Sequence, residues 1–68
     1  MSVSAALLAS LEAISHETTR MLNVLDANAE ALPPDDVREA KRRIFLIRTE
    51  AQELFDWIGA ARLEEPRN

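Results

Sequence analysis

The sequence predicts an all-α fold: an antiparallel helical hairpin that pairs with a second hairpin into a four-helix bundle. The chain has 68 residues, enough for one small domain, and it is rich in helix formers with a single glycine. One break, "LPPDD" at residues 32–36, divides it in two. In both halves apolar residues recur at spacings of three and four, the period of a helix that packs along one side. We therefore expect a single domain with helix 1 at about residues 4–31, a turn at 32–35 and helix 2 at about 36–63.

Helix 1 has a start signal, a stop signal and a continuous packing row. Ser2 or Ser4 is suited to cap its first turn, and Pro33 disfavours helical geometry at the residue before it. Two members of the row, Thr18 and Asn28, are polar, and they either fix the register of packing or loosen the helix near its end. The expected row consists of Leu7, Leu11, Ile14, Thr18, Met21, Leu25, Asn28 and Leu32.

Helix 2 follows the proline-containing turn. Pro34 or Asp36 is able to start it. Asp36 and Glu39 have the spacing of a capping box, so we expect Asp36 to cap the helix. Pro66 does not fit a helix interior, which places the end of the helix near Arg62 or Leu63. Gly59 is a weak point at which the helix would stop earlier. The expected packing row consists of Val37, Ala40, Ile44, Ile47, Ala51, Leu54, Ile58 and Ala61.

Two helices that pack on each other bury only one row each, and this chain has apolar residues to spare. Leu8 and Leu22 widen the row of helix 1, whereas Phe45, Phe55 and Trp57 are expected off the row of helix 2. Exposed apolar area of this kind marks an interface. We expect a non-enzymatic module that self-associates or docks on a larger protein, as an adaptor, co-chaperone or regulator. The expected interface consists of Leu7, Leu11, Ile14, Met21, Leu25, Ile44, Phe45, Ile47, Leu54, Phe55, Trp57 and Ile58.

Composition argues against several other classes of function. The chain has no cysteine and one histidine, so neither a disulfide nor a structural zinc site is expected, and no cofactor motif is present. A net charge of −4 disfavours binding to nucleic acid or to anionic membranes, and we interpret the "KRR" cluster at residues 41–43 as a solvated surface. No apolar run approaches the roughly 20 residues of a membrane span, and the N-terminus lacks the basic region of a signal peptide. The expected location is the cytoplasm.

The single histidine, His16, lies opposite the expected row of helix 1. It should be exposed, with Glu12 one turn before it and Arg20 one turn after it. No second histidine is available, and the neighbouring Ser15 points elsewhere on the helix, so no catalytic triad is expected. An exposed imidazole beside a carboxylate is able to accept a phosphoryl group when another protein supplies the nucleotide site.

The segment "ISHETTRML", residues 14–22, resembles the H-box of sensor histidine kinases, whose dimerisation and phosphoacceptor domain is a helical hairpin. Ser15, His16, Glu17 and Leu22 match a pattern near S-H-E-L-R-T-P-L, whereas residues 18–21 depart from it. The resemblance implies the alternative function of a phosphotransfer hairpin, with His16 as the acceptor and Glu17 as the assisting acid or base. Arg20 stands where that family positions water for dephosphorylation, so the resemblance does not extend to phosphatase activity.

Overall fold

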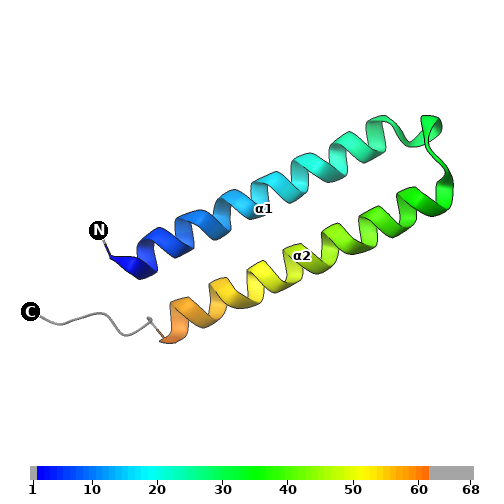
Figure 1. Ribbon diagram of the computed structural model, residues 1–68. Coiled ribbons are helices and arrows are strands. Elements are labelled where there is room, and N and C mark those ends of the chain that lie inside the picture. Colours follow the sequence, from blue (N-terminus) through cyan, green and yellow to red (C-terminus); the bar gives the residue numbers. More distant parts are fainter. Residues whose placement is uncertain (1, 62–68) are drawn as a thin grey trace, which may run out of the picture.

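The computed structural model describes residues 2–61, and within this range the chain is an all-α hairpin. Helix α1 spans Val3–Ala27, a short 3-10 helix η1 spans Ala29–Ala31, and helix α2 spans Pro34–Ala61. The two long helices run antiparallel, side by side along their length, with η1 at the closed end (Figure 1). The predicted fold class is confirmed.

Helix α1 starts with a serine cap. The Ser2 hydroxyl oxygen accepts a hydrogen bond from the Ala5 backbone N–H at 3.0 Å, while the Ser2 backbone is extended. This bond satisfies one of the four N–H groups that the first turn of a helix leaves without a partner. Of the two expected capping residues, Ser2 is the one that caps.

Helix α1 ends at Ala27, before the expected position near Ala31, because Asn28 terminates it. The Asn28 side chain donates to the Val24 carbonyl at 2.8 Å, and its backbone N–H donates to the Leu25 carbonyl at 3.2 Å. These bonds satisfy two of the last carbonyls of α1, after which the chain continues into the tighter 3-10 turn. Asn28 is therefore a helix-end residue and not a polar member of the packing row.

Helix α2 begins at Pro34, and the expected cap at Asp36 is wrong. A proline fits the first helical position because its φ angle suits a helix and an N–H there would have no intrahelical partner. Asp35 and Asp36 consequently lie inside the first turn, where negative charge favours the helix dipole. Glu39 does not close a capping box, since its carboxylate binds Arg42 and Arg43. The expected end near Leu63 lies outside the described residues.

The helices meet along a seam with alternating spacings of three and four residues. Four hydrophobic side chains in residues 2–60 are buried: Leu11, Val37, Ile44 and Ile58. Thr18 joins them with 1% of its surface exposed, and its hydroxyl donates to the Ser15 carbonyl at 2.8 Å. The half-buried members of the seam are Leu8, Ser15, Leu22 and Leu25 on α1 and Lys41, Arg48, Ala51 and Phe55 on α2.

The seam shares every second residue with the expected rows. Each of the other seam residues lies one position later in the sequence than expected, so both helices are rotated about their axes relative to the prediction. The expected rows are right at Leu11, Thr18, Leu25, Val37, Ile44, Ala51 and Ile58. They are wrong at Leu7, Ile14, Leu32, Ile47 and Leu54, which are exposed. Phe55, expected off the row, lies in the seam.

Two basic residues, Lys41 and Arg48, lie in the rotated seam. Lys41 occupies a seam position but extends past the edge of α1, where its Nζ lies 2.5 Å from the Asp26 carboxylate. Arg48 extends in the same way and donates to the Thr19 hydroxyl. Long basic side chains bury their methylene groups while the charge reaches water or a partner, so both residues are tolerated between the helices.

Candidate functional site

The rotated seam leaves one side of the hairpin apolar. Rows of hydrophobic residues run beside the seam on each helix at seven-residue intervals, and further apolar residues lie one turn from them. We call this surface the apolar face. It consists of Leu7, Ile14, Met21 and Val24 on α1 and Ala40, Ile47, Leu54 and Trp57 on α2.

The rows of the two helices lie on the same side of the hairpin. Near the turn, Met21 and Val24 from α1 and Ala40 and Ile44 from α2 line one hollow of about 330 Å³. Ala40, the smallest residue of the apolar face, is among the residues that line the hollow. The apolar face is therefore depressed near the turn, while its bulkiest side chain, Trp57, lies toward the opposite end of α2.

The side chains of the apolar face are exposed to an extent unusual for large hydrophobic residues. The exposed fraction is 40% for Ile14, 48% for Ile47, 44% for Leu54 and 54% for Trp57. The hairpin is one layer of two helices, so nothing in residues 2–61 covers them. A contiguous apolar surface of this kind is characteristic of an interface, whereas single exposed hydrophobic residues are not.

The opposite side of the hairpin is mostly polar and is cross-linked between the helices. The Lys41–Asp26 ion pair and the Arg48–Thr19 hydrogen bond both lie along this edge. We call this surface the polar face. It includes Ala9, Glu12, His16, Thr19 and Asp26 on α1 and Arg38, Phe45, Thr49 and Gln52 on α2.

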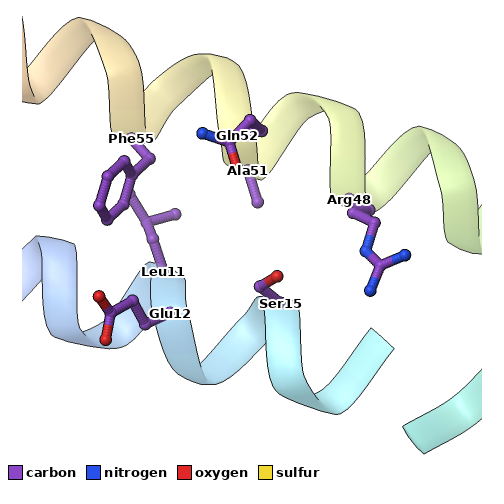
Figure 2. Close-up of a pocket in the computed structure, with 7 residues that line it drawn as sticks. All are labelled: Leu11, Glu12, Ser15, Arg48, Ala51, Gln52 and Phe55. Atoms are coloured by element: carbon purple, nitrogen blue, oxygen red, sulfur yellow. The ribbon is translucent and has the colours of Figure 1, made fainter. Parts of the chain in front are cut away.

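A groove of about 240 Å³ on the polar face has no catalytic arrangement. Figure 2 shows the side chains of Leu11 and Phe55 reaching toward each other across the groove, with Glu12, Ser15 and Arg48 along it. The groove has no histidine and no second carboxylate beside Glu12, so its serine hydroxyl has no base to activate it.

The basic cluster of α2, Lys41 to Arg43, is partly neutralised, because two carboxylates pair with its three positive charges. Arg42 and Arg43 both bind the Glu39 carboxylate, with N–O distances of 2.6 and 2.7 Å, and Lys41 binds Asp26. The hydrogen bonds from Arg42 and then Arg43 lower the pKa of Glu39 to about 2. A phosphate backbone would have to compete with these carboxylates, which weakens the case for a nucleic-acid interface.

His16 lies on the polar face with its side chain exposed, as the sequence predicts. Within the described residues it makes no hydrogen bond and no ion pair. Its neighbour Glu17 binds Arg20 at 2.6 Å, and the hydrogen bonds that Arg20 donates lower the pKa of Glu17 below its ordinary value. Glu17, the expected assistant of phosphotransfer, is thus held by Arg20.

The expected interface residues fall into three environments. Buried in the seam are Leu11, Ile44 and Ile58; half-buried are Met21, Leu25 and Phe55; exposed on the apolar face are Leu7, Ile14, Ile47, Leu54 and Trp57. Phe45, which is 51% exposed, lies on the polar face, so one flat partner surface cannot cover it together with Trp57. Ala40 was not expected at the surface, although its pattern, a small residue in a row of large ones, was visible in the sequence.

No group of three or more histidine, cysteine or acidic side chains in residues 2–61 is placed to hold a metal ion. Neither helix in this range is long and apolar enough to cross a membrane.

No protein-family model, no curated protein and no solved structure matches the chain.

Proposed function

We propose that this chain is a non-enzymatic interaction module that works by packing its apolar face against helices of another polypeptide. The observation that carries the proposal is the apolar face itself, a row of exposed leucine, isoleucine and tryptophan side chains along both helices. Burying the exposed half of one such side chain contributes about 1 kcal/mol, so several of them together support a stable complex.

The rotation of the helices strengthens the proposal. An isolated hairpin that minimised its exposed apolar area would turn Ile47 and Leu54 inward and Lys41 and Arg48 outward. The chain does the reverse: the two basic residues occupy the seam and the two aliphatic residues face outward. This rotation is favourable when a partner covers the outward row, because the seam row is then buried between the helices and the outward row is buried against the partner.

A partner consisting of helices fits this surface best. The apolar face is long and narrow, and its residues repeat with the spacing that packs against a helix. Such a partner is either a second copy of the chain or a helical segment of a larger protein, which corresponds to an adaptor, co-chaperone or regulator.

Site-specific photo-crosslinking tests the proposal without knowledge of the partner. Benzoylphenylalanine is introduced at Leu54, on the apolar face, or at Gln52, on the polar face, and the cells that naturally contain the protein are irradiated. We expect adducts of defined mass from Leu54 and none from Gln52. Equal yields at both positions, or none at Leu54, would exclude the apolar face as the interaction surface.

Phosphoryl acceptance at His16 is the alternative function, and one observation favours it. The His16 side chain is exposed on the polar face, which would stay accessible in a complex formed through the apolar face. The engagement of Glu17 with Arg20 weighs against it, because the assisting carboxylate of the H-box pattern is not available.

A further inference from the structure

We propose that the apolar face is covered by a second copy of this chain, packed with its turn at the opposite end, so that Trp57 of each copy fills the hollow beside Ala40 of the other. This inference rests on the proposed function and names its partner. The relation between the copies is a two-fold axis, under which both copies use the same surface.

The apolar face has a hollow near the turn and a bulky exposed side chain near the opposite end. Ala40 and its neighbours Met21, Val24 and Ile44 leave a hollow of about 330 Å³ near the turn. Trp57 stands near the other end of α2 with 54% of its surface exposed. Interfaces pack to the density of protein interiors, so an exposed tryptophan and an apolar hollow on the same face are complementary features.

The spacing of Trp57 and Ala40 along α2 determines how far two copies overlap. The two residues are 57 − 40 = 17 residues apart, about 25 Å along the axis of α2. A two-fold axis perpendicular to α2 that brings Trp57 of each copy opposite Ala40 of the other crosses α2 midway between these residues, between residues 48 and 49. The midpoint of α2, Pro34–Ala61, lies between residues 47 and 48. Placing each Trp57 at the other copy's Ala40 therefore overlaps the two hairpins over almost their full length.

The arrangement with both turns at the same end fits worse. It would bring the two bulky ends together, with Leu54 and Trp57 of one copy facing Leu7 of the other. It would also place the two hollows at the turn end opposite each other, where no bulky side chain fills them. Voids of this kind lose the contacts that their lining would otherwise make.

The area of the contact is sufficient for a stable dimer. Two helices that lie side by side, each roughly 40 Å long and 10 Å wide, present a face of roughly 800 Å². Stable complexes bury about 800 Å² on each partner. A second hairpin of the same length covers this face completely.

Charges beside the face are compatible with the same register. Glu50, which follows Ile47 by three residues on α2, makes no ion pair within the described residues. In the antiparallel overlap it lies about one helical turn from Arg43 of the other copy. Arg20 lines the hollow, where its guanidinium would lie beside the inserted Trp57 ring as a cation–π partner.

A distance measurement between the two turns tests the arrangement. The chain has no cysteine, so a Glu30→Cys variant carries a single spin label in the turn. We expect a label-to-label distance of about 40 Å, because the turns lie at opposite ends of helices of that length. A distance below about 20 Å would show that the turns share one end and would overturn the arrangement.

A matched pair of alanine variants tests the hollow. Ala40→Glu places a carboxylate where Trp57 of the other copy enters, and we expect it to weaken dimerisation at least tenfold and to shift Trp57 fluorescence to the red. Ala9→Glu, an exposed position on the polar face, should change neither. Equal dimerisation of the two variants would overturn the inference. A wild-type chain that stays monomeric would also overturn it, while heteromeric Leu54 adducts would still uphold the proposed function.

Discussion

Thr18 is the most enclosed polar side chain of the described residues, with 1% of its surface exposed. Its hydroxyl needs no partner on α2, because it donates to the Ser15 carbonyl within α1 at 2.8 Å. A β-branched side chain of this size fits between the helices, and the local bond removes most of the cost of burying a hydroxyl.

Replacing Thr18 with valine tests whether this hydroxyl has any further role. The Thr18→Val variant keeps the shape of the side chain and removes a buried polar group, so we expect the free energy of unfolding to stay equal or to rise by up to about 1 kcal/mol. Thermal and urea unfolding measure it. A loss of more than about 1 kcal/mol would mean that the hydroxyl fixes the register of the seam.

His16 offers a second test at the level of one residue. The side chain is exposed and unpaired, so His16→Ala should change stability by no more than a few tenths of a kcal/mol. Incubation of the wild-type chain with phosphoramidate, followed by intact-mass measurement, should give no adduct. An acid-labile phosphoryl adduct that His16→Ala abolishes would favour the phosphotransfer hairpin instead.

Helix α2 carries the clearest electrostatic feature at the level of an element. Arg42 and Arg43, three and four residues after Glu39, form ion pairs with its carboxylate along one surface of the helix. The pair energies are small because all three side chains are exposed, but the effect on titration is large. The pKa of Glu39 falls from 4.5 to about 2.

This lowered pKa predicts a specific dependence on pH. A carboxyl group whose pKa is lower in the folded chain stabilises the fold above its unfolded pKa. That contribution is lost as the pH falls from about 4.5 to about 2. Carboxyl NMR should place the Glu39 midpoint near pH 2, and Arg42→Gln should raise it. Arg38→Gln is the control, since Arg38 binds Asp35. A wild-type midpoint near 4.5 would contradict the pairing.

Local sequence signals predicted some of the helix boundaries correctly and others incorrectly. Pro33 correctly marks the turn, because a proline restricts the residue before it wherever it occurs. The cap at Asp36 was a wrong prediction because Pro34 was itself suited to start the helix, and sequence spacing does not rank the two signals. Asn28 ended α1 through its own side chain, an outcome that an apolar pattern does not contain.

At the scale of the whole molecule, the sequence specifies two helices but not which side of each faces inward. Each helix contains two possible packing rows that share every second residue. Where the rows differ, adjacent apolar residues such as Leu7 and Leu8, or Leu54 and Phe55, provide one residue for each row. Hydrophobicity alone favours the row with Ile47 and Leu54. In the structure the other row is buried, and within it Lys41 and Arg48 reach partners across the seam, tertiary contacts that the apolar pattern does not contain.

The same ambiguity explains why the candidate site was only partly predictable. Unpaired apolar residues were evident from their number, so an interface was expected. Whether Phe45 or Trp57 belongs to it depends on the rotation of α2, and the structure puts them on opposite sides. The hollow at Ala40 depends on which residues of α1 lie next to it, and the periodic pattern of one helix does not predict which residues of the other helix it contacts.

Sedimentation of the pure chain, with two variants of nearly equal exposure, tests most directly the claim that the apolar face binds a second copy. Ile47 and Phe45 are 48% and 51% exposed, the first on the apolar face and the second on the polar face. We predict that the wild-type chain and Phe45→Asp sediment with twice the 7.6 kDa mass of one chain, with a melting temperature that rises with concentration. Ile47→Asp should sediment as a single chain, because a carboxylate in an apolar contact costs several kcal/mol. A wild-type chain that sediments at 7.6 kDa at every micromolar concentration, with a melting temperature independent of concentration, would contradict the claim.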